Sequence, residues 1–380
     1  MNPDLGLRVL GSVMAWDDDK AHVEFQRLRL MAALKYDGYR DFEAGVRFIE
    51  SLASWLQQFG LGQREVAYEF VMNRLVYIGP SEMEKLVSQF YSNVVHPEIL
   101  SAVADEMGVP RYALLSNEEA RQRIARLRRR TLFLGLSDGA RVDYIRHQNV
   151  GLISNEQVVG STQLDSAKWA DLLDELQKWL DDGEATFRAV YLIDDFAATG
   201  TSFFRLDETG KAKGKLYKFA ASVRNAQTTL SRRVFGDDYE VFIHHYVGTA
   251  KACKELAQRL RGAQQVLTEA GLPPKVRTTY GLLLPDWLPL NADNPEDRAF
   301  LDLADQYYDH SIHTKHTEVG GTQDMKLGYG GCALPVILDH NTPNNSMPLL
   351  WAETVGAPED GENPPVPAMR PLFRRRQRHE

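Results

Sequence analysis

The 380-residue sequence has few cysteines, no long apolar run and no excess of positive charge. Two cysteines, Cys253 and Cys332, are too few for a disulfide framework or a zinc cluster, so a reducing cytoplasm is the expected compartment. No run of about 18 apolar residues occurs, so no membrane-spanning helix is expected. The first residues lack the basic and apolar regions of a secretory signal. The net charge of −8 gives the whole molecule no electrostatic attraction for nucleic acid.

Two segments are nevertheless strongly basic. Residues 121–130 (RQRIARLRRR) hold six arginines, and residues 373–380 (FRRRQRHE) hold four. Contact with nucleic acid through these segments is one interpretation. A solvated helix face for the first segment and a disordered tail for the second is the simpler one.

Residues 1–129 are predicted to form an all-helical N-terminal domain. Apolar residues recur at spacings of three and four within 22–36, 42–60 and 81–95. Ser116 and Glu119 form a capping-box pattern for a further helix that ends near residue 129. No catalytic cluster stands out here, so a helical scaffold or docking surface is expected.

Residues 130–351 show short apolar segments that alternate with amphipathic ones. Strands are predicted at 131–136, 189–194, 218–223, 239–248 and 277–284, and helices at 166–182 and 250–260. This alternation predicts an α/β fold with a mostly parallel sheet covered on both faces. The remaining residues, 352–380, are Pro-rich and then basic, and we expect them to be disordered.

The most informative segment is VYLIDDFAATGTS, residues 190–202. Its apolar part predicts a buried strand that ends in Asp194 and Asp195, at the edge where open α/β sheets bind ligands. The small residues that follow let backbone N–H groups approach an anion, and a helix expected to begin at Phe203 would favour phosphate there. Adjacent carboxylates can accept hydrogen bonds from a vicinal diol. A phosphate site beside a diol site predicts a ribose 5-phosphate ligand.

This segment resembles the phosphoribosyl-pyrophosphate signature of type I phosphoribosyltransferases: four apolar residues, two acids, two aliphatic residues, then small residues with Thr and Gly. The resemblance implies that Asp194 and Asp195 hold the ribose 2- and 3-hydroxyls. Two residues depart from the pattern: Phe196 replaces an aliphatic residue, and residue 198 is an alanine where the purine-salvage branch has a catalytic aspartate. By the same resemblance, the 5-phosphate would be held by Ala198, Thr199, Gly200, Thr201 and Ser202.

Two other interpretations of the segment remain open. It could be a strand that ends in two solvated aspartates before an ordinary turn. It could also be a Walker B strand, but that interpretation requires a G-x-x-x-x-G-K-[ST] loop, which the sequence lacks.

The residues after the first predicted strand of the sheet have two equally good interpretations. Phosphoribosyltransferases place a pyrophosphate-binding loop at this point, which Ser137, Asp138 and Gly139 would form. Gly139 would supply an unusual backbone angle, and Arg141 would neutralise pyrophosphate. A plain turn before a helix explains the same residues.

The turn HNTPNN, residues 340–345, is rich in side chains that bond their own backbone, which is enough to explain it. The alternative is a cluster that contacts a base or a partner protein, made of His340, Asn341, Asn344 and Asn345. Three histidines occur at 310, 313 and 316, but no nearby cysteine and no well-placed second acid completes a ligand set, so no metal site is assigned to side chains.

SDGA at 137–140, the degenerate signature and HNTPNN-x-x-P-L-L-W together resemble the phosphoribosyltransferase-like family of bacterial conflict and anti-phage systems. The resemblance implies a defence effector that binds phosphoribosyl pyrophosphate or a nucleotide 5-phosphate, with Mg²⁺ if it is catalytic, and a protein partner from the same operon. Two alternatives remain: a catalytically inactive nucleotide sensor that docks a partner, and a nucleotide salvage phosphoribosyltransferase. The catalytic residues, and whether the protein is an enzyme, stay open.

Overall fold

The computed structural model describes the whole chain except residues 1–2, 162, 274, 359–364 and 376–380. The chain forms two compact units, the first made of residues 1–83 and 286–380 and the second of residues 84–285. This division differs from the predicted boundaries at 129/130 and 351/352. None of the helices in the described ranges is long and apolar enough to cross a membrane.

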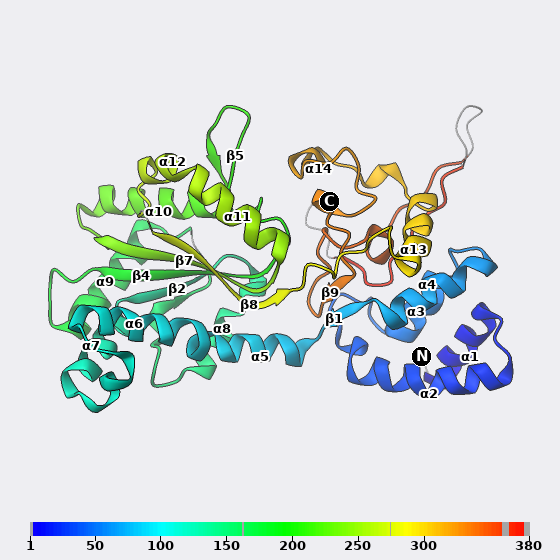
Figure 1. The fold of residues 1–380 in the computed structure, drawn as a ribbon, viewed down its shortest axis with the longest axis horizontal. Helices are drawn as coiled ribbons and strands as arrows, with labels where there is room; N and C mark the ends of the chain where they lie inside the picture. The colour runs from blue at the N-terminus through cyan, green and yellow to red at the C-terminus, as the bar shows by residue number, and fades with distance from the viewer. Residues whose placement is uncertain (1–2, 162, 274, 359–364, 376–380) are drawn as a thin grey trace. The chain divides into compact units, whose positions relative to one another are not determined.

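A five-stranded parallel sheet forms the centre of the second unit, in the order β3-β2-β4-β7-β8 (Figure 1). The predicted α/β fold with a mostly parallel sheet is therefore confirmed. The short apolar runs of the sequence become strands because both of their faces are buried. The strands are β2 Thr131–Gly135, β3 Val158–Val159, β4 Phe187–Ala197, β7 Phe235–Thr249 and β8 Val276–Leu284.

Helices cover both faces of this sheet. One face packs Val190, Leu192 and Ile243 against α9 Ser166–Leu180, α10 Lys215–Leu230, α11 Ala250–Gly262 and α12 Gln264–Glu269. On the other face, Tyr191 meets Phe90 of α5 with ring centroids 5.5 Å apart. The remaining helical elements of this unit lie before β2 in the sequence or between β2 and β3. Those before β2 are α5 Pro80–Phe90, the π-helical turn η2 Tyr91–Val95, α6 His96–Met107, η3 Arg111–Ser116 and α7 Glu118–Arg129, and those after it are η4 Asp138–Ala140, α8 Val142–Gln148 and η5 Asn155–Gln157.

Three local predictions for this unit are wrong. The predicted strand 218–223 lies inside α10, because its buried residues recur at helical spacing, as in Phe219, Ala220 and Val223. The N-cap of α7 is Asn117, not Ser116, since the Asn117 side chain accepts from the Ala120 N–H at 3.2 Å.

The helix expected at Phe203 is also absent. The chain instead enters a two-stranded hairpin, β5 Arg205–Leu206 with β6 Ala212–Lys213. A turn closes the hairpin: Asp207 Oδ1 accepts from the N–H groups of Thr209 at 3.0 Å and Lys211 at 2.9 Å. No helix N-terminus therefore follows the predicted phosphate loop directly.

The first unit joins the two ends of the chain. β1 Val76–Ile78 pairs in parallel with β9 Val336–Leu338, and Trp55 Nε1 donates to the Leu349 carbonyl at 2.6 Å. These contacts explain why residues 286–351 fold with the N-terminal helices and not with the parallel sheet. The other elements of this unit are α1 Pro3–Met14, α2 Asp18–Leu34, η1 Tyr36–Gly38, α3 Phe48–Leu56, α4 Leu61–Asn73, α13 Pro295–Gln306, η6 His310–Ile312, α14 Lys315–Val319, η7 Tyr329–Gly331 and η8 Pro348–Leu350.

The predicted disorder of the C-terminal tail is wrong for its described residues, 352–358 and 365–375. Leu372 and Phe373 are fully buried in the core of the first unit. The backbone N–H groups of both residues donate to the Leu350 carbonyl. Met369 is buried as well. These three apolar residues anchor the segment in the core, although its average composition is that of a disordered chain. The rest of the predicted tail lies outside the described residues.

Candidate functional site

Two adjacent carboxylates lie on β4, the central strand of the sheet. Asp194 and Asp195 precede the last residue of the strand, Ala197. β2 has already ended at this level, because its last residue, Gly135, pairs with Ile193. The two acids therefore lie beyond the carboxyl end of β2, but they do not terminate their own strand as predicted.

The two carboxylates point to opposite faces of the sheet, because successive residues of a strand alternate. Asp194 shares a face with Leu192 and is only 5% exposed. Asp195 is partly exposed, and its Oδ1 accepts from the Phe196 N–H at 2.9 Å. The structure keeps the predicted ribose-binding acids adjacent but does not direct them to the same face.

Asp194 connects three separate elements. Its Oδ1 accepts a hydrogen bond from Ser137 Oγ at 2.5 Å, in the loop after β2. Its Oδ2 forms an ion pair with Nζ of Lys215, the first residue of α10. Burial raises the pKa of Asp194 to about 6 and the charge of Asp195 adds to the rise, while Lys215 and Ser137 oppose it. The predicted pyrophosphate loop and a predicted ribose-binding acid are therefore in direct contact.

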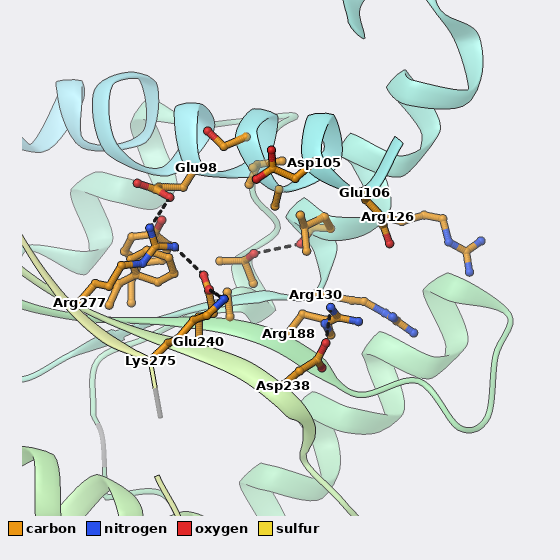
Figure 2. A pocket seen from close by; sticks show the side chains of 18 of the residues that line it. Glu98, Asp105, Glu106, Arg126, Arg130, Arg188, Asp238, Glu240, Lys275 and Arg277 are labelled. Carbon is orange, nitrogen blue, oxygen red and sulfur yellow. Dashed lines mark hydrogen bonds and ion pairs between the residues drawn. The ribbon is translucent and has the colours of Figure 1, made fainter. Parts of the chain in front are cut away.

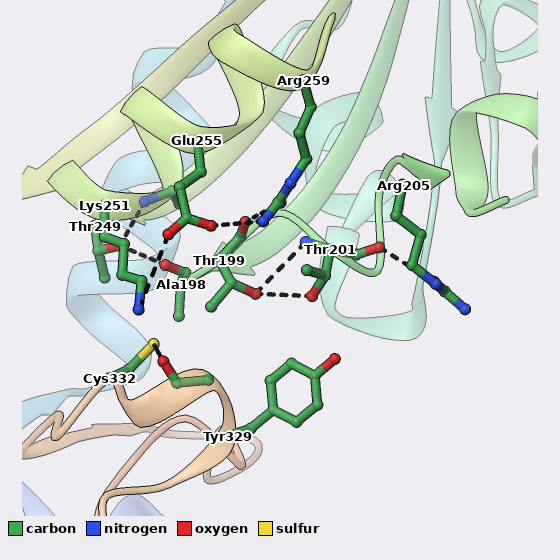
Figure 3. Close-up of polar contacts among 12 residues, drawn as sticks. Ala198, Thr199, Thr201, Arg205, Thr249, Lys251, Glu255, Arg259, Tyr329 and Cys332 are labelled. Atoms are coloured by element: carbon green, nitrogen blue, oxygen red, sulfur yellow. Dashed lines mark hydrogen bonds and ion pairs between the residues drawn. The ribbon is translucent and has the colours of Figure 1, made fainter. Parts of the chain in front are cut away.

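The predicted phosphate loop, residues 198–202, is a compact turn (Figure 3). Gly200 has a φ of +68°, in the left-handed region that favours glycine, and its carbonyl accepts from the Phe203 N–H at 3.1 Å. The hydroxyl oxygens of Thr199 and Thr201 lie 2.8 Å apart. The loop thus presents small residues and hydroxyl groups in a fixed backbone conformation.

Helix α11 supports this loop from one side (Figure 3). Thr249, the N-cap of α11, donates from Oγ1 to the Ala198 carbonyl at 2.8 Å. Arg259 Nη1 donates to the Thr199 carbonyl at 2.5 Å, and its Nη2 pairs with Glu255 at 2.6 Å. These bonds engage two carbonyl oxygens of the loop, which are groups that would otherwise repel an anion.

The loop after β2 is the 3₁₀ turn η4, whose final carbonyl, of Ala140, accepts from Tyr246 Oη at 2.9 Å. The residue in the left-handed region is Arg141, with a φ of +48°. Gly139 is buried and has no positive φ, so the backbone role predicted for it is wrong. Ser137 is the residue of this loop that reaches Asp194.

Two histidines are buried side by side in sequence on β7. His245 pairs across the sheet with Asp194 and therefore shares its face. Burial lowers the pKa of both His244 and His245 to about 3; the charge of Lys215 lowers the pKa of His245 further. Both imidazoles are neutral near pH 7. Within the described part of the chain, Nδ1 of His245 has no hydrogen-bond partner.

Lys215 and Arg259 are the site residues that sequence reasoning missed. Lys215 lies 21 positions after Asp194, beyond the unexpected hairpin, so no motif spacing connects the two. Arg259 reaches the loop from the third turn of α11. Its spacing of four from Glu255 was the one available signal, and that spacing indicates only an ion pair along a helix.

The predicted base or partner contacts at 340–345 belong to the first unit, not to the unit that contains Asp194. His340 Nδ1 lies 3.0 Å from Asp339 Oδ1. Asn345 is 8% exposed, and its Nδ2 donates to the Tyr329 carbonyl at 2.8 Å. The structure thus gives Asn345 a place in the packing of its own turn. Of the other two predicted contacts, Asn341 exchanges two backbone hydrogen bonds with Leu338, and the Asn344 carbonyl accepts from the Tyr329 N–H.

Comparison with known protein families decides the assignment. The family model PRTase-CE matches residues 52–375, which is most of the chain and includes residues of both units. The chain belongs to the PRTase-CE family. PRTase-CE is a phosphoribosyltransferase-type domain family, which agrees with the parallel sheet and with the signature resemblance at residues 190–202. No curated protein and no solved structure matches the chain significantly.

Proposed function

We propose that the second unit of this PRTase-CE protein binds a 5-phosphorylated ribose, either phosphoribosyl pyrophosphate or a nucleotide 5-phosphate. The contact between Ser137 and Asp194 carries the proposal, because it joins the loop that follows β2 to the carboxyl-terminal part of the neighbouring parallel strand β4. Ligands of open α/β sheets bind at this edge. The family membership supports the same ligand class.

By the resemblance, Asp194 and Asp195 would accept hydrogen bonds from the ribose hydroxyls. Because the two carboxylates point to opposite faces of β4, each would accept from a different hydroxyl. Asp194 is already paired with Lys215, so a hydroxyl that approaches it would share the carboxylate with the ammonium group. The loop 198–202 would hold the 5-phosphate, and Ser137 with Arg141 would approach the pyrophosphate. These roles follow the resemblance residue by residue, and the hydrogen bonds of the loop to α11 support the phosphate role.

Magnesium would bind mainly through oxygens of the ligand. Among the described residues, no three His, Cys, Asp or Glu side chains gather as a metal site. Of the two adjacent acids, Asp194 forms an ion pair with Lys215, so the partly exposed carboxylate of Asp195 is the protein oxygen donor that the ion would use. This donor set fits Mg²⁺, which takes few ligands from the protein and would neutralise the charge of a bound pyrophosphate.

The biological role that we propose is that of an effector in a prokaryotic anti-phage defence system, with a protein partner from the same operon. This part rests on the resemblance of SDGA, the degenerate signature and HNTPNN to conflict-system proteins.

A nucleotide sensor without catalytic activity is the second candidate, because Lys215 neutralises Asp194 in the same site. Release of pyrophosphate from phosphoribosyl pyrophosphate separates an enzyme from a sensor. Neighbouring immunity genes separate both from a salvage enzyme.

Thermal unfolding with a set of related ligands tests the ligand class. Ribose 5-phosphate should raise the melting temperature, and 2-deoxyribose 5-phosphate should raise it much less, because it lacks one hydroxyl of the diol. The Asp195→Asn variant should lose this discrimination. Equal stabilisation by the two sugars in the wild type would contradict the proposal.

A further inference from the structure

A second concave site lies in the same unit, at the opposite edge of the sheet. A cavity of about 690 Å³ opens where β2, β4, β7 and β8 begin, and α6 and α7 form its other wall (Figure 2). This volume is within the range of small-molecule sites in proteins. The lining residues of β4 include Ala189 and Tyr191, which precede the carboxylates of the candidate site on the same strand.

Apolar groups form part of the cavity wall. Ile99 of α6 and Leu127 of α7 line the cavity together with Tyr191 and Phe242, whose rings stack with their centroids 4.4 Å apart. Ala189 adds a small side chain beside them. This part of the wall suits the organic body of a ligand, since most ligand sites combine an apolar lining with a few polar groups.

Three arginines line one end of the cavity: Arg126, Arg130 and Arg188 (Figure 2). Arg188 pairs with Asp238 at 2.8 Å, and Arg130 lies 3.6 Å from Asp182. Arg126 has no carboxylate within salt-bridge distance among the residues that the structure describes. Asp105 and Glu106 of α6 also line the cavity, and Glu106 lies 3.8 Å from Arg123, a further lining arginine. Of the three arginines, Arg126 is therefore the one whose charge no described ion pair offsets.

Arg130 shows how closely these charges are gathered. Its Nε is buried and has no hydrogen-bond partner within the described ranges. Burial lowers the pKa of Arg130, Asp182 opposes that effect, and Arg188 and Arg126 add to the lowering as like charges. Guanidinium groups that repel one another around an open cavity are stabilised when an anion binds between them.

The other end of the cavity is already neutralised. Arg277 pairs with Glu98 at 2.9 Å and with Glu240 at 2.6 Å, and it lies 4.5 Å above the ring of Phe242. Lys275 also pairs with Glu240, at 3.3 Å. An anionic group would therefore bind at the end formed by Arg126, Arg130 and Arg188.

We propose that this cavity binds a phosphorylated organic molecule of nucleotide size, with its phosphate held by Arg126, Arg130 and Arg188. The site is separate from the ribose-phosphate site at the carboxyl edge of the sheet, and it does not depend on that site being functional. It also gives part of the Arg-rich segment 121–130 a role. A small ligand fits better than nucleic acid, because Arg121 pairs with Glu118 and Arg129 is buried, so the segment does not present a continuous basic surface.

Calorimetric titration with ATP tests the proposal. The wild type and the Asp194→Asn/Asp195→Asn double variant should both bind ATP, because the cavity does not involve these acids. Arg126→Gln and Arg188→Gln should each weaken the affinity about tenfold or more, the effect expected for a lost charge-assisted hydrogen bond. Arg121→Gln is the matched control on the same helix and should leave the affinity unchanged. Both arginines of the test are at least partly exposed, so the variants should fold, and their melting temperatures verify this.

Three results would overturn the proposal. The first is no ATP binding by the double variant, which would leave only the ribose-phosphate site. The second is an equal loss of affinity in Arg121→Gln and Arg126→Gln, which would indicate nonspecific attraction. The third is tighter binding of single-stranded RNA than of ATP with the same arginine dependence, which would indicate a nucleic-acid surface.

Discussion

Asp194 on β4 and Lys215 at the start of α10 form an ion pair in which the carboxylate is buried and the ammonium group is partly exposed. The hairpin β5–β6 separates the two residues along the chain and brings α10 back to the end of β4. The ion pair reduces but does not cancel the cost of burying the carboxylate, because the pKa of Asp194 is still raised to about 6.

The first prediction is that Asp194→Asn stabilises the protein at neutral pH. A raised pKa means that the folded state favours the uncharged carboxyl, which asparagine mimics, so the free energy of unfolding at pH 7 should increase by about 3 kcal/mol. The gain should shrink as the pH falls from 7 towards 4, because wild-type Asp194 then takes up its proton. Urea unfolding across this pH range measures the effect. Asp171→Asn, at an exposed position of α9, is the control and should show no change.

The second prediction concerns the buried His244, whose contribution to stability changes with pH in the opposite direction to that of Asp194. The pKa of His244 falls to about 3 in the folded state, below its ordinary value of 6.5. The stability that the neutral imidazole contributes is therefore fully present above pH 6.5 and is lost as the pH falls towards 3. His244→Phe should therefore reduce the stability lost between pH 7 and pH 5 by about 2 kcal/mol. Urea unfolding at the two pH values measures it. His147→Asn, at an exposed position, is the control and should lose as much stability as the wild type. An equal loss in wild type and His244→Phe would show that His244 is not neutral in the folded protein.

The third prediction is that Gly200→Ala disturbs the phosphate loop. An alanine at a φ of +68° costs about 1 kcal/mol, and its Cβ would also lie 3.1 Å from Leu256 Cβ. We expect a modest loss of stability and a loss of ribose 5-phosphate affinity of more than about tenfold, since the loop backbone would shift. Gly183→Ala is the control, because nothing lies near its Cβ position. Unchanged affinity in Gly200→Ala would remove the loop from the binding site.

The fourth prediction concerns the C-terminal segment. Phe373 is fully buried and stacks against Phe42 and Phe48, with centroids 5.8 Å away in each case. Phe373→Ala should lower the free energy of unfolding of the first unit by about 3 to 4 kcal/mol. Val355→Ala, in the same segment but 97% exposed, should have almost no effect. A small effect of both substitutions in thermal unfolding would mean that the segment is not part of the core.

The parts of the fold that depend on local pattern were predictable from the sequence. The strands 131–136 and 239–248 and the helix 166–182 are close to β2, β7 and α9, because apolar periodicity reports burial directly. The segment 218–223 was misassigned because a short apolar run has the same appearance in a strand and in a helix. The tail was misassigned because its buried residues, Leu372 and Phe373, are hidden in a Pro-rich and basic average.

The candidate site was predictable only in part, for a similar reason. The motif identified Asp194 and the loop 198–202, because the motif is contiguous in the sequence. The partners Lys215 and Arg259 become neighbours only through the paths of the hairpin and of α11. The division into units also depends on the pairing of Val76 with Val336, which no local pattern indicates.

Calorimetric titration of phosphoribosyl pyrophosphate with Mg²⁺ is the most direct test of the central claim, that Asp194 and Asp195 belong to a ribose-phosphate site. It should be carried out on the wild type, on Asp194→Asn/Asp195→Asn and on the control Asp171→Asn. We predict binding by the wild type and the control, and loss of binding in the double variant although that variant is folded and at least as stable. No binding by the wild type, or equal binding by the double variant, would contradict the assignment of these carboxylates to the site.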